Sequence, residues 1–172
     1  MAGESFEFTD ADMVTVGTVG TPGRRVFLLQ VQVADQIVTL KLEKQQVAAL
    51  SAALVERLED LPVTGDLPTD LDLHQPVEVE WAVGAMGLGY LDTLDRIVLD
   101  AIEAVAVDEE GNPTEPHGRF RVLLTREQGR ALAIRAVSLV EAGRPPCPWC
   151  GNPLDPAGHT CPKKNGKHAP ER

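Results

Sequence analysis

The sequence has few cysteines, few aromatic residues and no long apolar run. Its three cysteines cannot all pair within one chain, so a disulfide framework is excluded. Aromatic residues make up only 4% of the chain, so aliphatic side chains must fill the core. No run of about eighteen apolar residues occurs, and the first ten residues lack the basic and apolar regions of a secretory signal. We therefore expect a cytoplasmic protein without a membrane span.

Negative charge dominates everywhere except at the C-terminal end. The formal net charge is −10. From Arg144 onward five basic residues stand against two acidic ones, so this part carries +3 and the remainder −13. An acidic body repels a phosphate backbone, which restricts any nucleic-acid binding to the basic tail at 164–172. A simpler role for the negative charge is that it keeps the protein soluble.

Apolar periodicity predicts a hairpin and a helix in the first half. Apolar and polar residues alternate over 25–33 and again over 38–42, which is typical of two half-buried strands. From 44 to 61 the apolar residues recur every three or four positions and predict an amphipathic helix that Pro62 ends. The proline-containing stretch 62–76 is then predicted to be a connecting loop.

The second half shows the same kinds of element. Strands are predicted over 77–83, 97–107 and 120–124, the middle one more central because its apolar run is longer. Thr125 and Gln128 form a capping box at the start of a second amphipathic helix.

Three pairs of segments match in the same order in the two halves. They are VGTVG with VGAMG, RVFLLQ with RIVLDA, and LKLEKQQVAAL with VLLTREQGRAL. We expect an α+β body with a mainly antiparallel sheet, built from two pseudo-symmetric strand-strand-strand-helix repeats at about 1–61 and 77–143. An approximate two-fold axis would relate them, and the repeats would share one core because neither could bury its own apolar faces alone.

Glycines at 17, 20 and 23 raise the question of a phosphate-binding loop. Such loops lead into the N-terminus of a helix, whereas this one leads into a predicted strand. A turn or bulge between strands accounts for the pattern better, and its recurrence at Gly84 and Gly87 favours a structural role.

All three cysteines lie close to a histidine in the predicted module at 144–163. Cys147 and Cys150 form a C-x-x-C pair, and His159 and Cys161 follow as a second pair of ligands. Three thiolates and one imidazole are a closed tetrahedral set for a structural Zn²⁺. Thiolates disfavour magnesium and calcium, and the lack of a fourth cysteine disfavours an iron–sulfur cluster.

A redox motif, a catalytic zinc site and a chance grouping are the alternatives to a structural zinc site. A redox C-x-x-C needs a following helix, which the prolines around it disfavour. A catalytic zinc needs an open coordination position, and four local ligands leave none. The four residues could also lie together by accident. Trp149, between the first two ligands, is either a stacking platform or an anchor on the body, and the anchor is the more common role.

Several motifs resemble a known family, the actinobacterial domain-of-unknown-function family 3090. They are GTVGTPGRR, LEKQQV, VGAMGL and AGRPPCPWCGNPLDPAGHTCPKKNG, and they span nearly the whole chain. The resemblance implies a soluble bacterial protein without an established activity. The family's Cys-x-x-Cys and His-x-Cys elements fall on Cys147, Cys150, His159 and Cys161.

Two functions fit these observations. The first is a non-enzymatic zinc-binding module that interacts with another macromolecule, a protein in the first place. The second is an enzyme with a site between the repeats, acting on a small anionic or nucleotide substrate. The matching segments 43–46 and 125–128, at the two helix starts, either cap the helices or form that site.

Overall fold

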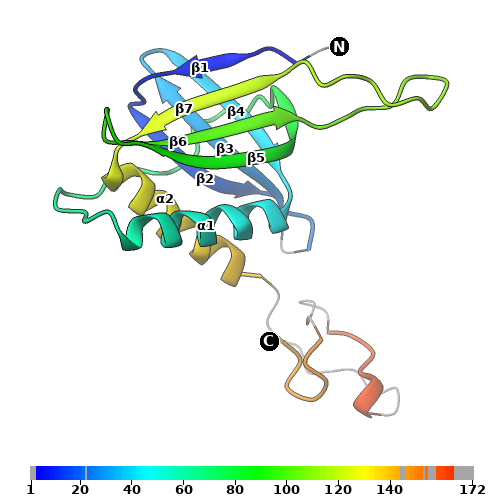
Figure 1. Ribbon diagram of the computed structural model, residues 1–172. Helices are drawn as coiled ribbons and strands as arrows, with labels where there is room; N and C mark the ends of the chain where they lie inside the picture. The colour runs from blue at the N-terminus through cyan, green and yellow to red at the C-terminus, as the bar shows by residue number, and fades with distance from the viewer. Residues whose placement is uncertain (1–2, 22, 144–145, 153, 155–157, 165–172) are drawn as a thin grey trace.

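A computed structural model describes residues 3–21, 23–143, 146–152, 154 and 158–164. One seven-stranded sheet curls over two helices that lie on the same face (Figure 1). This arrangement confirms an α+β fold. The elements are β1 (Phe6–Phe8), β2 (Met13–Val19), β3 (Val26–Val33), β4 (Gln36–Leu42), α1 (Lys44–Glu59), β5 (Trp81–Leu91), β6 (Arg96–Glu103), β7 (Arg119–Leu124), α2 (Arg126–Glu141) and a 3-10 helix (Pro162–Lys164).

The strand order across the sheet is β1-β7-β6-β5-β4-β3-β2. Neighbouring strands are antiparallel except in two pairs, β1 with β7 and β4 with β5. The two outermost strands, β1 and β2, follow each other in the chain and are joined only by residues 9–12. The sheet must therefore curl strongly to bring its opposite edges toward each other, and the helices fill the concave side (Figure 1).

The element order contains strand-strand-strand-helix twice, as β2-β3-β4-α1 and as β5-β6-β7-α2. The hairpin and both helices lie where periodicity predicts them, and Thr125 caps α2 by accepting from the backbone N–H of Gln128. The approximate two-fold axis and the repeat boundaries at 1–61 and 77–143 stay predictions.

The start of β5 was predicted four residues too early. Residues 77–80 form no strand, and β5 begins at Trp81 and continues to Leu91. Gly84 and Gly87 consequently lie inside this strand and not in a turn. The bulge part of the prediction holds at Gly84, where the β5–β6 register shifts between Val83 and Ala85. A side chain at Gly84 would come within 2.8 Å of the backbone of Ala104, so this position needs a glycine.

The predicted strand over 97–107 ends early, at Glu103. Val105 and Val107 are 59% and 69% exposed and belong to a long arm between β6 and β7. Their apolar character therefore does not reflect burial in the sheet. Figure 1 shows this arm extending away from the rest of the fold.

Strand β2 is buried on both faces over most of its length. Residues Met13 to Gly17 are all buried. The helices cover one face, and residues 71–74 of the loop between α1 and β5, here called the covering segment, lie against the other. Thr15 donates to the carbonyl of Leu71, and the buried Gln30 on β3 bonds both backbone groups of His74. The predicted loop therefore completes the core.

The core is aliphatic, as the composition requires. Valine and leucine side chains from the sheet and both helices make up most of one continuous cluster, with Phe27, Trp81 and Phe120 as its fully buried aromatic residues. Within the described part of the chain, neither helix is long and apolar enough to cross a membrane.

Candidate metal centre

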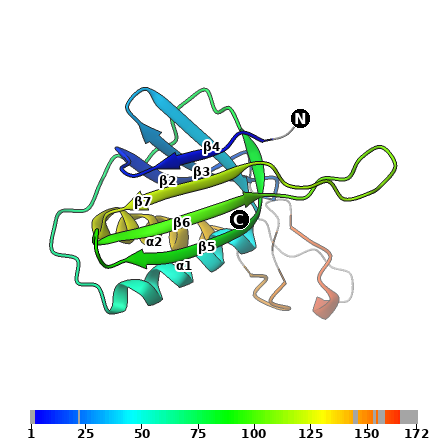
Figure 2. The same cartoon turned by 45° about the horizontal axis from the view of Figure 1, so that its top comes forward.

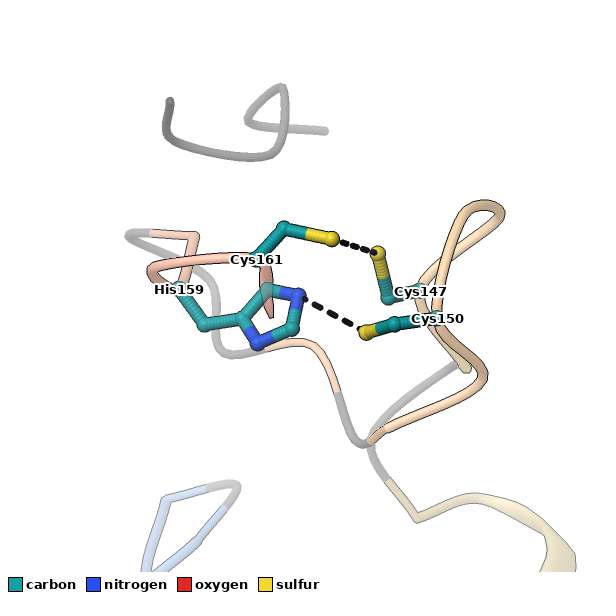
Figure 3. A group of neighbouring side chains, drawn as sticks. All are labelled: Cys147, Cys150, His159 and Cys161. Atoms are coloured by element: carbon teal, nitrogen blue, oxygen red, sulfur yellow. Dashed lines mark hydrogen bonds between the residues drawn. The ribbon is translucent and has the colours of Figure 1, made fainter. Parts of the chain in front are cut away.

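The first two cysteines lie in a tight turn beyond the C-terminal end of α2. The N–H of Cys147 donates to the carbonyl of Asn152 at 2.7 Å, and the N–H of Gly151 donates to the carbonyl of Cys147 at 2.9 Å. Gly151 closes the turn with a φ of 78°, a conformation that glycine adopts without strain. The turn holds the thiols of Cys147 and Cys150 on the same side (Figure 3).

The second pair of residues faces this turn. Figure 3 shows His159 and Cys161 on a separate stretch of chain, with their side chains directed toward Cys147 and Cys150. The four ligand atoms all lie within 4.8 Å of one another. The sulfurs of Cys147 and Cys161 are 4.0 Å apart, and Cys150 Sγ lies 3.6 Å from His159 Nε2. The structure thus brings together all four residues that the sequence singled out.

These separations suit a tetrahedral ion. Zinc–sulfur bonds of about 2.3 Å and zinc–nitrogen bonds of about 2.0–2.1 Å place two sulfurs about 3.8 Å apart and a sulfur and a nitrogen about 3.5 Å apart. The Cys147–Cys161 and Cys150–His159 distances lie within a few tenths of an ångström of these values, and the remaining pairs of ligand atoms lie within 4.8 Å. A disulfide needs about 2.05 Å between its sulfurs, so the cysteines here are free thiols. The donor set is therefore matched to a metal ion in both geometry and chemistry.

The surroundings of Cys147 and Cys150 shift the pKa values of their thiols in opposite directions. Burial by itself would raise the pKa of the Cys147 thiol, but hydrogen bonds from His159 and from the amides of Cys150 and Trp149 outweigh it and lower this pKa to about 6. Burial and the neighbouring sulfurs of Cys147 and Cys161 raise the pKa of the Cys150 thiol. The hydrogen bond from the amide of Asn152 lowers this pKa, but it is outweighed. Amides directed at a sulfur stabilise a thiolate, the form that binds a metal.

The apolar core of this segment is very small. Among its described residues, Cys147, Leu154 and Cys161 form a cluster separate from the main core, and Cys150 and Trp149 pack against it. Trp149 packs against this small cluster, and its role as an anchor on the body or as a stacking platform stays a prediction. Two of the three buried members are metal-ligand candidates. Burial of apolar surface alone can thus contribute little to holding this segment together.

The matched polar segments at the helix starts are capping structures. Glu43 and Gln46 form a capping box at α1, as Thr125 and Gln128 do at α2. Each glutamine also reaches into the sheet region, with Nε2 of Gln46 donating to the carbonyl of Val83 and Nε2 of Gln128 to that of Ala11. Gln46 thus holds α1 against β5, and Gln128 holds α2 against the connection between β1 and β2.

One polar cluster in the body gave no signal in the sequence. The turn between β5 and β6 brings Asp95 to Arg126 at 2.7 Å and to the hydroxyl of Tyr90 at 2.6 Å. The hydrogen bond to Asp95 is the main reason why the pKa of Tyr90 is raised. Arg126 also donates to the carbonyl of Pro62. Because these contacts tie a turn, a loop and a helix start together, the cluster has a structural role.

A second structural carboxylate fixes the base of the long arm. One oxygen of Glu103 accepts from the backbone N–H groups of Gly3, His117 and Gly118 at 2.9–3.1 Å. The bonds from Gly118 and then from His117 and Gly3 lower the pKa of this carboxyl against the opposing effect of burial. His117 contacts Glu103 through its backbone, and His74 likewise contacts Gln30 through its backbone.

The fold and this site define a small α+β protein with a C-terminal Cys₃His candidate metal centre. The chain belongs to the family described as a protein of unknown function, DUF3090, which matches residues 6–161. The match covers the body and all four candidate ligands, so the resemblance inferred from the motifs is confirmed at the level of the family. The actinobacterial origin stays a prediction. None of the curated proteins matches the chain.

Proposed function

We propose that the protein binds one structural Zn²⁺ through Cys147, Cys150, His159 and Cys161. The observation that carries the proposal is the approach of these four donor atoms to within 4.8 Å, at separations that suit tetrahedral bonds. Three sulfur ligands favour zinc over oxygen-preferring cations. Four protein ligands fill a tetrahedral shell, so the site is structural and not catalytic.

A bound zinc ion would supply the energy that the small core lacks. It would neutralise thiolates that otherwise repel each other, and it would link the turn that carries Cys147 to the stretch that carries His159. The amides of Trp149 and Cys150 already favour a thiolate at Cys147. The module proposed at 144–163 would then fold as a consequence of metal binding, between a body at 1–143 and a basic tail at 164–172.

We infer further that the protein is a non-enzymatic, cytoplasmic interaction module with a protein partner. The polar side chains that are buried in the described part of the body support this view. They are Thr15, Gln30, Thr39 and Ser51, none of them ionisable, and each is hydrogen-bonded within the fold. An enzyme acting between the two repeats would be expected to place ionisable groups there, to act as general acids or bases. The enzyme alternative therefore has no comparable support, and nucleic acid could bind only at the basic tail.

The zinc proposal is tested by the metal content of the freshly purified, reduced protein. Native mass spectrometry should find one zinc ion per chain. Replacement of Cys150 by Ser should remove it, whereas Thr160→Ser, an exposed position between two ligands, should retain it as the matched control. Less than half a zinc ion per chain in the parent protein would refute the proposal. Retention of the full zinc content by Cys150→Ser would refute the ligand assignment.

A further inference from the structure

Three stretches of strand edge in the described part of the sheet differ in how they are protected. Strand β1 has only three residues. The edge of β2 is covered by α2, because Arg135 donates through Nε to the carbonyl of Val16 at 2.7 Å. The third stretch belongs to β5, which pairs with β4 only at Trp81 and Ala82. From residue 84 to residue 91 no described strand lies beside β5 on that side (Figure 2).

The backbone groups at this edge can be assigned from the register. The N–H of Glu103 points to β7, where it donates to Gly118, so alternate residues such as Asp100 and Val98 point to β5. Asp100 and Val98 face Gly87 and Gly89 of β5. It follows that the residues between and beside these glycines, Met86, Leu88 and Tyr90, direct their N–H and C=O groups away from β6 toward the open side.

Helix α1 runs past this edge without closing it. Near the start of the helix, Gln46 donates to the carbonyls of Val83 and Gly84. Farther along, a groove of about 370 Å³ separates the helix from the strand. Its lining combines apolar side chains with charges that are mostly negative. The lining residues are Ala53, Glu56, Arg57, Asp60 and Leu61 from the helix side and Leu88, Tyr90 and Asp92 from the strand side.

We propose that the open edge of β5 binds an extended segment of a partner protein in which apolar and basic residues alternate. The segment would add as a strand, exchanging hydrogen bonds with the outward backbone groups of Met86, Leu88 and Tyr90. Its apolar side chains would contact Leu61, Leu88 and Tyr90 in the groove. Its basic side chains would face the carboxylates of Glu56, Asp60 and Asp92, which outnumber the single arginine there.

A protein segment fits this edge better than a second copy of the chain does. Edge-to-edge pairing of two β5 strands would bring the same acidic groups of both copies together, on bodies that each carry −13. The proposed segment would be the partner in the interaction role proposed above. The open edge of β5 belongs to the body, so a test of peptide binding there is independent of the zinc proposal.

The test begins with random peptides displayed on phage and selected against the full zinc-loaded chain. The best peptide, labelled with fluorescein, is then titrated by anisotropy against the parent protein and its variants. Leu88→Pro removes an outward N–H and leaves the pairing with β6 in place, so binding should weaken about tenfold or more. Leu88→Val, which keeps the N–H, should bind nearly as well as the parent. Cys150→Ser should also bind normally, which separates this outcome from failure of the zinc site.

Two further measurements identify strand addition itself. Two versions of the peptide are compared, one N-methylated at every odd amide and the other at every even amide. Only every second amide of an added strand faces β5, so one version should lose binding and the other should bind nearly as well as the unmodified peptide. In the parent protein, the amides of Met86, Leu88 and Tyr90 should exchange fast with deuterium when free and become protected with peptide bound. Those of Gly87 and Gly89 should be protected throughout. This exchange pattern needs no variant and therefore holds even if Leu88→Pro fails to fold.

Three results would overturn the proposal. The first is that no selected peptide prefers the parent over Leu88→Pro, with the three amides already protected in the free protein. The second is that the two alternately methylated peptides lose binding equally. The third is a dimer in sedimentation experiments that Leu88→Pro dissociates, which would make a second copy the occupant of the edge.

Discussion

Removal of the proposed zinc ion should unfold the C-terminal segment and leave the body intact. Ordering a residue costs about 1–2 kcal/mol of backbone entropy, so the 14 described residues between Pro146 and Lys163 cost at least about 14 kcal/mol. Leu154, 4% exposed, is the one fully buried residue among them that is not a ligand candidate, and its burial returns only about 2 kcal/mol. Structural zinc sites contribute about 10–16 kcal/mol to folding, which is comparable to the entropy cost that the burial of Leu154 leaves uncompensated.

Nuclear magnetic resonance would follow this transition residue by residue. On addition of a strong zinc chelator, the amide signals of 146–163 should collapse to random-coil positions, while those of the sheet and both helices stay dispersed. Re-addition of zinc should restore them. The thermal unfolding of the body, measured by circular dichroism, should shift little, because its core cluster shares no residue with the small cluster around Leu154. Dispersed signals from 146–163 in metal-free protein would refute the energetic argument.

Three further predictions concern the body. Gly118→Ala should destabilise it by about 1–3 kcal/mol in denaturant titrations, because the added methyl group meets the rigid ring of Trp81 at 2.7 Å. Gly87→Ala, whose methyl group meets nothing within 4 Å, is its control, and equal losses would contradict the packing argument. Glu103→Gln should lower the melting temperature at neutral pH. The pKa of Glu103 in the folded protein lies below its ordinary value, so its charge stabilises the fold only above that pKa. The difference in melting temperature between the parent and Glu103→Gln should therefore vanish as the pH falls through the lowered pKa of Glu103. A difference that stays constant with pH would exclude a role for the charge. Gln30→Ala should cost about 1–3 kcal/mol and accelerate hydrogen exchange in the covering segment, whereas unchanged exchange would show that Gln30 does not hold it.

The accuracy of the sequence-based predictions followed how local each feature was. The four candidate metal ligands lie within fifteen positions, and their spacing alone was enough to group them. The capping box at Thr125 also depends on only a few neighbouring residues. By contrast, the burial of β2 on both faces depends on the helices and on the covering segment, which lie far from it in the chain. Val105 and Val107 caused the predicted strand to be too long, because apolar residues in an exposed arm have the same local pattern as the end of a strand.

The sequence by itself determined the composition of the core, the positions of both helices and which four residues cluster as candidate ligands. These features follow from periodicity, capping and spacing, which act over short stretches of chain. The tertiary structure decided which strands are neighbours, that the covering segment buries Gln30, and that β5 continues past the last residue with which β4 pairs. Contacts between residues far apart in the chain fix these features. The open edge of β5 exists only because β4 ends and α1 begins beside it, a relationship that no local pattern encodes.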